Sequence, residues 1–226
     1  MRYALVTGSS RGIGLAIADK LTDSGYTVFR NGRSMKVDPL YIQADLSKLD
    51  GVESLGDAVL NRTKSLDCLV LNAGATCRKP LAETEYDDWQ LVIDTNMSMP
   101  FFLIKRLFEN ISDGGSVIFI SSAMALKPHA ASVSYGVTKA AVNMMAQCLV
   151  KEFAPRGIRV NVICPGFIDT QWQKEKPDWL RTKIEGKISL GRFGMPEEVA
   201  DLCLHMIENN YFNGAIVSLD GGYDMQ

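Results

Sequence analysis

The stretch TGSSRGIG, residues 7–14, constrains the fold of this chain more than any other feature. It follows a short strand-like run at 3–7 and opens a segment of helical period at 12–24. Glycines allow a tight turn and close backbone approach to a ligand, and the N-terminus of the following helix attracts anions. The stretch therefore predicts a pyrophosphate-binding turn, with an ordinary strand–helix connection as the alternative.

Strand-like and helix-like segments alternate along the rest of the chain. Strands are expected at 3–7, 27–31, 40–43, 68–71, 116–120, 159–163 and 216–219, and helices at 12–24, 48–63, 86–110, 132–154 and 196–208. Several strands are apolar on both sides, which is typical of parallel strands with helices on both faces. The alternation predicts an α/β fold with a doubly wound parallel sheet of about seven strands.

Composition narrows the classes of protein to which the chain can belong. Its 226 residues, 46% of them apolar, suit a single domain over residues 1–226. A net charge of −2 offers no basic face for nucleic acid. The first predicted strand leaves no room for a signal peptide, and the apolar runs are too short to span a bilayer. We expect no nucleic-acid partner and no membrane partner.

The cysteines and histidines offer little material for a metal site. The five cysteines are odd in number and lack metal-ligand spacing, and the two histidines are His129 and His205. We expect no metal, and free thiols in the reducing cytoplasm. His129 could contact a substrate, with an exposed loop position as the alternative.

The end of the second predicted strand bears on the choice of dinucleotide. An acid here would suit the free ribose 2′-hydroxyl of NAD, but the chain has Gly32 and Arg33. The guanidinium of Arg33 suits a 2′-phosphate, and Arg11 supplies a second cation. These residues favour NADP over NAD, unless Arg33 is a solvated loop residue.

The connection after Arg33 is unusually short. Seven residues, SMKVDPL, separate Arg33 from Tyr41, whereas parallel strands usually need a crossover of a dozen or more. We therefore expect a short extended crossover without a helix and an abbreviated sheet edge at the adenosine end. The role of Arg33 depends on how this edge folds.

A tyrosine and a lysine, Tyr135 and Lys139, lie one helical turn apart at the start of a predicted helix. They share a face, and an ammonium beside a phenol favours the phenolate. Such a pair could transfer a proton at neutral pH, or it could be two residues on a solvated helix.

Eight motifs, in order and with similar spacing, resemble the short-chain dehydrogenase/reductase family. They are TGSSRGIG (7–14), ADL (44–46), LNAGA (71–75), TNMSMPFF (95–102), ISSAMA (120–125), YGVTK (135–139), RVNVICPGFIDT (159–170) and DGGY (220–223). LGRFGMPEEVA at 190–200 is similar to the β-ketoacyl-[acyl-carrier-protein] reductases within that family.

The resemblance implies a Rossmann-like fold and roles for particular residues. Tyr135 would be the acid/base, and Lys139 would lower its pKa and hold the nicotinamide ribose. Ser122 would donate a hydrogen bond to the substrate oxygen, and Asn96 would support a water-linked proton relay. The implied cofactor-binding residues are Gly8, Ser10, Arg11, Gly12, Ile13, Gly14, Arg33, Asp45, Leu46, Asn72, Ala73, Gly74, Tyr135, Lys139, Pro165, Gly166, Ile168 and Thr170.

Two further features concern partners. Residues 170–192 are expected to form a substrate flap, and their six cations against three acids would attract an anionic substrate or an acidic carrier protein, unless they are a solvated amphipathic helix. Segments 101–108 and 140–150 are apolar nearly all round, so either a large core or another subunit must cover them. In a chain of this size we expect the subunit, in a homodimer or homotetramer.

Three hypotheses of function follow. The first is an NADPH-dependent reductase that converts a carbonyl to a secondary alcohol, with a 3-oxoacyl thioester as one candidate substrate. Hydride transfer leaves charge on the carbonyl oxygen, which a hydroxyl and a phenol can stabilise and protonate. The second is an NAD(P)-dependent alcohol or sugar dehydrogenase. The third, a dinucleotide-binding redox sensor without turnover, has no reason to retain Asn96, Ser122, Tyr135 and Lys139 together.

Overall fold

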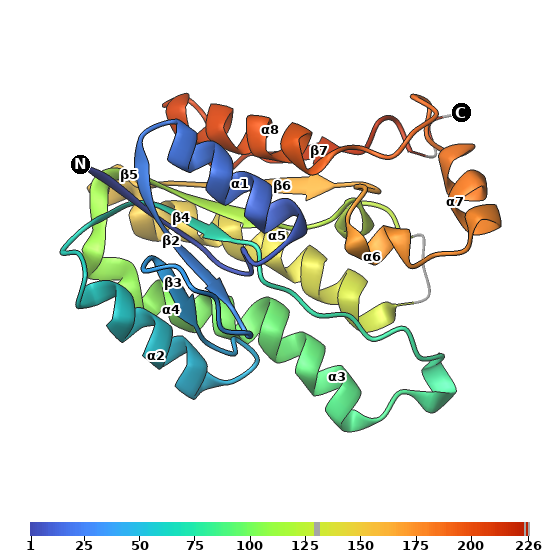
Figure 1. Ribbon diagram of the computed structural model, residues 1–226, viewed down its shortest axis with the longest axis horizontal. Coiled ribbons are helices and arrows are strands. Elements are labelled where there is room, and N and C mark those ends of the chain that lie inside the picture. Colours follow the sequence, from blue (N-terminus) through green and yellow to red (C-terminus); the bar gives the residue numbers. More distant parts are fainter. Residues whose placement is uncertain (129–131, 224, 226) are drawn as a thin grey trace.

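A seven-stranded, all-parallel sheet forms the centre of the computed structural model, which describes residues 1–128, 132–223 and 225 (Figure 1). The strands are β1 Arg2–Val6, β2 Tyr26–Gly32, β3 Tyr41–Gln43, β4 Leu66–Leu71, β5 Ile111–Ile120, β6 Arg159–Pro165 and β7 Ile216–Leu219. Their order across the sheet is β3-β2-β1-β4-β5-β6-β7. The predicted doubly wound α/β fold of about seven strands is confirmed.

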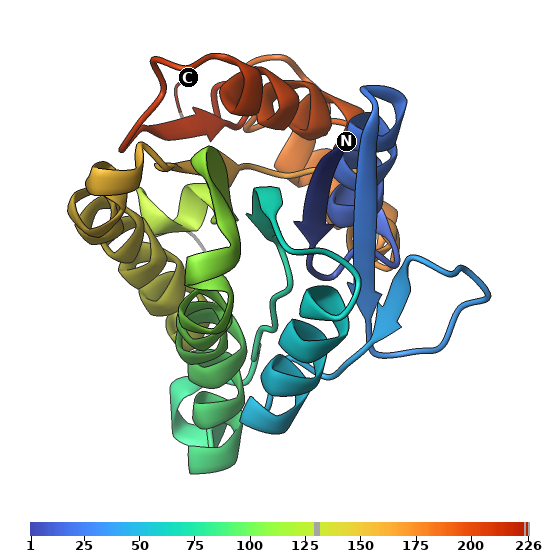
Figure 2. The same cartoon turned by 90° about the vertical axis from the view of Figure 1, so that its left-hand side faces the viewer.

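Helices cover both faces of this sheet. They are α1 Gly12–Asp23, α2 Leu49–Leu60, α3 Tyr86–Ile93, α4 Met99–Leu107, α5 Val133–Phe153, α6 Gln171–Lys174, α7 Asp178–Glu185 and α8 Pro196–Glu208. Alternate residues of a strand point to opposite faces, so Leu5 packs with α2, α4 and α5, whereas Ala4 and Val6 pack with α1 and α8. Two buried cores result, one on each side of the sheet. Figure 2 shows the helices that lie on these two sides.

The chain reverses its direction of winding between β1 and β4, which are neighbours in the sheet. A doubly wound sheet opens a crevice at such a point, at the carboxyl ends of the strands. Here Thr7 and Asn72 form two hydrogen bonds. The backbone N–H of Asn72 donates to Thr7 Oγ1 at 2.9 Å, and Asn72 Nδ2 donates to the Thr7 carbonyl at 3.0 Å. These bonds hold the glycine-rich turn against the loop that follows β4.

The helix expected over 86–110 is interrupted, so this prediction is wrong in its continuity. The segment contains α3, a π-helical turn at Asp94–Ser98, α4 and a 3-10 turn at Phe108–Asn110. Pro100 lacks an amide hydrogen and its ring would clash with the carbonyl four residues earlier, that of Asn96. A wider π turn relieves this conflict, and such turns often occur at functional sites.

The connection from β2 to β3 is short and contains no helix, as predicted. Figure 2 shows residues 33–40 as a blue loop that projects beside the sheet edge. β3 has only three residues, so the sheet edge is abbreviated. Lys36 folds back from this loop and donates to the carbonyl of Ser10 at 2.7 Å, so the crossover borders the glycine-rich turn.

Candidate active site

One cleft of about 860 Å³ lies at the carboxyl ends of the strands. It brings together Ser122, Tyr135 and Lys139 with the remaining residues that the resemblance assigned to the cofactor. Those are Gly8, Ser10, Arg11, Gly12, Ile13, Gly14, Arg33, Asp45, Leu46, Asn72, Ala73, Gly74, Pro165, Gly166, Ile168 and Thr170. Asn96 does not line the cleft but is buried behind it, with 2% of its surface exposed. His129 lies outside the described residues.

The glycine-rich turn has the shape and the donors that a dinucleotide pyrophosphate requires. A Cβ on Gly8 would lie 2.8 Å from the Ala73 Cα, and one on Gly14 would lie 2.4 Å from Asn72 Nδ2. No side chain caps the N-terminus of α1, where Arg11 is the N-cap residue, so its first amide groups are available to an anion. The residues present therefore fit a dinucleotide cofactor.

Ser122 and Tyr135 meet inside this cleft. Ser122 follows β5, and its Oγ accepts from the Met124 amide at 3.2 Å, which orients the hydroxyl. Tyr135 lies in the first turn of α5. Burial raises the pKa of the Tyr135 phenol, and a hydrogen bond from Ser122 opposes that rise. The phenol is therefore neutral at pH 7, which is the form that can donate a proton.

Lys139 lies beside Tyr135 in the cleft, and its lowering of the Tyr135 pKa stays a prediction. Its Nζ donates to the carbonyl of Ile120 at 2.8 Å and lies 5.6 Å from the centroid of the Tyr135 ring. Burial lowers the pKa of Lys139 itself from 10.5 to about 8. Gly74 covers this amine: a Cβ there would lie 3.7 Å from Nζ.

Asn96 holds three segments together. Its Oδ1 accepts from the Ala75 amide at 2.8 Å, and its Nδ2 donates to the Ala75 carbonyl at 3.0 Å and to Thr138 Oγ1 at 3.0 Å. Protein groups therefore engage its side chain, which joins the π turn to the loop after β4 and to α5. Asn96 is a positioning residue here, and the water-linked relay stays a prediction.

Several residues of the site were missed or undervalued from the sequence. Thr138 is the hydroxyl partner of Asn96, and Ser121 Oγ donates to the Lys139 carbonyl at 3.0 Å, which fixes α5 against the end of β5. Arg78 and Thr95 line the cleft, and the Thr95 hydroxyl is buried without a partner among the described residues. A loop residue such as Arg78 carries no periodic signal that could have placed it.

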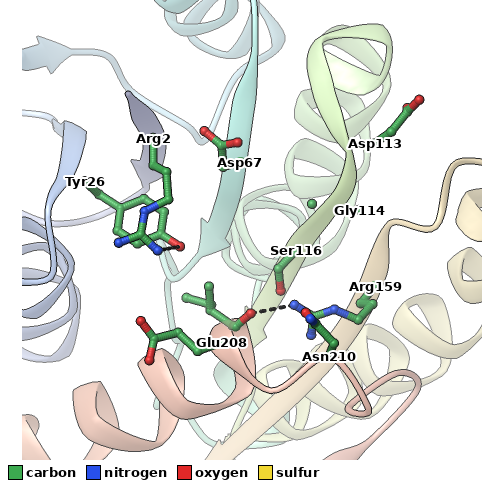
Figure 3. Close-up of a pocket in the computed structure, with 11 residues that line it drawn as sticks. Arg2, Tyr26, Asp67, Asp113, Gly114, Ser116, Arg159, Glu208 and Asn210 are labelled. Atoms are coloured by element: carbon green, nitrogen blue, oxygen red, sulfur yellow. Dashed lines mark hydrogen bonds between the residues drawn. The ribbon is translucent and has the colours of Figure 1, made fainter.

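A second cavity, of about 420 Å³, lies at the amino ends of the strands (Figure 3). Its two arginines, Arg2 and Arg159, already contact protein groups. Arg159 donates to four backbone carbonyls at and just beyond the end of α8, and the Arg2 guanidinium lies 4.2 Å from the centroid of the Tyr26 ring. We assign this cavity a structural role, because its arginines stabilise a helix end and a strand start.

The pKa of Lys139 predicts how activity depends on pH. Because burial lowers this pKa to about 8, the ammonium is present below pH 8 and is lost above it. We expect kcat for carbonyl reduction to fall as pH rises through about 8, since the ammonium would stabilise the phenolate that Tyr135 leaves behind. Rates measured across pH at saturating substrate test this, with Lys139→Arg as the control. An inflection near pH 8 that persists in Lys139→Arg would contradict the assignment.

Comparison with known proteins agrees with this geometry. A family model described as enoyl-(acyl carrier protein) reductase matches residues 8–224. The chain is 31% identical to the 3-oxoacyl-[acyl-carrier-protein] reductase FabG of Aquifex aeolicus, over 98% of this chain and 96% of that protein. It is 34% identical to glucose 1-dehydrogenase 2 of Bacillus subtilis, over 98% and 94% of the respective chains.

This chain is also similar to a solved structure along nearly its whole length. The Pseudomonas aeruginosa RhlG/NADP active-site complex superposes with a TM-score of 0.91 at 30% identity, over 99% of this chain and 96% of that one. Family match, identity and geometry agree over nearly the whole chain. The chain therefore belongs to the short-chain dehydrogenase/reductase family, whose members are oxidoreductases acting on carbonyl or alcohol groups.

Proposed function

We propose that the protein is an NADPH-dependent reductase that converts a carbonyl to a secondary alcohol, with Tyr135 as the proton donor. The observation that carries this proposal is the meeting of a neutral Tyr135 phenol and the Ser122 hydroxyl in the cleft that contains the glycine-rich turn. A 3-oxoacyl thioester is the substrate that we propose first, because FabG of Aquifex aeolicus is among the relatives.

In the proposed reaction, the dinucleotide would supply the hydride. Ser122 would donate a hydrogen bond to the carbonyl oxygen, and Tyr135 would transfer its phenolic proton as negative charge develops there. Lys139, whose Nζ is held by the Ile120 carbonyl, would stabilise the resulting phenolate from the same helix face. Gly12, Gly14 and Thr170 would border the cofactor.

The adenosine end of the cleft supports NADP as the cofactor. A Cβ on Gly32 would lie 2.0 Å from the hydroxyl oxygen of Tyr41, so no acid that binds a free ribose 2′-hydroxyl fits there without a shift of Tyr41. Arg11 and Arg33 line the cleft, and Lys36 reaches the adjacent Ser10 carbonyl. A 2′-phosphate would meet three cations at this edge.

The second candidate function is a dehydrogenase that oxidises an alcohol or a sugar. The relative named glucose 1-dehydrogenase 2 favours it, at 34% identity. The same residues would serve in reverse, because Tyr135 would then accept the alcohol proton. The matching family model, described as enoyl-(acyl carrier protein) reductase, adds a C=C double bond to the substrates that a test should include.

A cofactor titration and a substrate panel test the proposed function. We expect NADPH to bind more tightly than NADH by fluorescence titration, and a 3-oxoacyl thioester or a ketone to drive NADPH oxidation. Tighter binding of NADH would contradict the cofactor assignment. Turnover confined to an enoyl thioester, or to a sugar in the oxidative direction, would contradict carbonyl reduction.

We also propose a cytoplasmic homodimer or homotetramer. Phe101, Phe102 and Met144 expose 43%, 37% and 60% of their surface on the outer faces of α4 and α5, which supports cover by another subunit. All five cysteines are free, as in a reducing compartment. Within the described residues, no helix has the length and apolar character needed to cross a membrane.

A further inference from the structure

The cations of residues 170–192, all of which the structure describes, differ in exposure and in whether they line the cleft. Arg181 pairs with Asp169 at 3.1 Å, and Arg192 donates to both oxygens of Glu198 at 2.9 and 2.7 Å. The three exposed lysines of the flap are Lys174, Lys183 and Lys187, and they do not line the cleft. Lys176 is the one half-buried lysine of the flap, and it does line the cleft.

Arg78 comes to the same part of the cleft from the loop after β4. Its guanidinium carbon lies 5.1 Å from the centroid of the Trp172 ring, which belongs to α6, four residues before Lys176. Burial, and then the charges of Arg78 and Arg181, lower the pKa of Lys176. Among the described residues, neither Arg78 nor Lys176 has a carboxylate within ion-pair distance.

Two like charges facing one cleft repel each other, and an anion between them would remove that cost. The Arg78 guanidinium lies over the indole of Trp172 and has no carboxylate partner among the described residues, so it can form paired hydrogen bonds to an oxyanion. We propose that Arg78 and Lys176 bind an oxyanion, a carboxylate or a phosphate, carried by the carbonyl substrate. This assignment rests on the proposed carbonyl reduction.

The elements that position Arg78 place it with the catalytic half of the cleft. Asn96 holds Ala75 of the same loop, and Ser132 Oγ, one residue before α5, donates to the Cys77 carbonyl. Tyr135 follows Ser132 by three residues. Arg11 and Arg33 lie on the glycine-rich turn and the β2 end instead, so the cleft has one cation set for the dinucleotide and another for the substrate.

Matched substrates that differ in one anionic group test the proposal. The first pair is acetoacetyl-phosphopantetheine and acetoacetyl-pantetheine, and the second is acetoacetate and methyl acetoacetate. In Arg78→Ala/Lys176→Ala we expect kcat/KM to fall about 10- to 100-fold for the charged member of one pair and to hold for its neutral member. The pair that responds identifies the oxyanion as phosphate or carboxylate.

Binding provides a readout independent of turnover. By calorimetry on the NADP-saturated protein, we expect phosphopantetheine to bind more tightly than pantetheine, or acetate more tightly than acetamide, and the double variant to lose that preference. If no carbonyl substrate oxidises NADPH, the proposed function fails, yet this comparison still decides the oxyanion site. Absence of any charge preference in the wild-type protein would overturn the proposal.

Two controls distinguish a local oxyanion site from general attraction by the positive charges of the flap. Lys174→Ala/Lys183→Ala removes the same number of charges from the exposed side of the flap, and we expect it to keep the charge preference. A loss there as large as in Arg78→Ala/Lys176→Ala would overturn a local site. Weaker NADPH binding by Arg78→Ala/Lys176→Ala, without substrate, would assign the pair to the cofactor and also overturn the proposal.

Discussion

Tyr135→Phe is expected to lose carbonyl reduction by about 100- to 10,000-fold while it binds NADPH as the wild-type protein does. Phenylalanine keeps the ring that packs in the first turn of α5 but removes the only proton that the side chain can donate. It also leaves the Ser122 hydroxyl without its phenol partner. Single-turnover rates at saturating NADPH measure the loss, and fluorescence titration measures cofactor binding.

Tyr211 provides the matched control, because its side chain is fully exposed and lies outside the cleft. Tyr211→Phe makes the same chemical change and should alter neither the rate nor the NADPH affinity. Should Tyr135→Phe reduce the substrate at the wild-type rate, the proton would have to come from another group, and the proposed role of Tyr135 would be wrong.

Gly14→Ala is expected to impair both folding stability and cofactor binding. The new methyl group would lie 2.4 Å from Asn72 Nδ2 and 2.5 Å from the carbonyl oxygen of Gly8, and one of these partners is backbone. Overpacking of this kind costs about 1–3 kcal/mol in the free energy of unfolding. The displaced turn would also lose its fit to a pyrophosphate, so the NADPH dissociation constant should rise at least about 10-fold.

Gly186→Ala is the control for this substitution. Its new Cβ would lie 3.5 Å from the nearest atom, the Thr182 carbonyl oxygen, which is an ordinary contact. Chemical denaturation and NADPH titration should therefore give the wild-type stability and NADPH affinity for Gly186→Ala. For Gly14→Ala they should give a lower free energy of unfolding and a weaker affinity for NADPH. Wild-type stability and NADPH affinity of Gly14→Ala would mean that the glycine-rich turn can shift to accept a methyl group. The close packing of Gly14 against Asn72 would then not be required.

The sequence predicted the sheet well because each strand is a short aliphatic run between polar turns. All seven expected strands occur, with bounds that differ by a few residues, as at β5, where residues 111–115 extend the strand. The helix over 86–110 was less predictable, since its apolar period continues across the π turn. Pro100 was the available signal, because a proline inside a helical pattern marks a break or a kink.

The residues proposed to bind the cofactor line one cleft because many of them follow strand ends, and parallel strands present those ends at one edge of the sheet. The contacts of Lys139 could not be predicted from the sequence, since local spacing says nothing about the Ile120 carbonyl, which binds its amine from another element. Arg78 was missed for a related reason. Its position depends on how the loop after β4 approaches α6, and only the tertiary structure determines that path.

The π turn at Asp94–Ser98 makes one stretch of the chain unusually sensitive to insertions and deletions. Deleting one residue there would restore regular helical winding and would remove the widened turn that presents Asn96. The amide of Asn96 would then swing away from Ala75 and Thr138. A regular helix and the hydrogen bonds of Asn96 to Ala75 and Thr138 are therefore alternatives at this point. Variants with a shortened turn should keep their fold more readily than their activity.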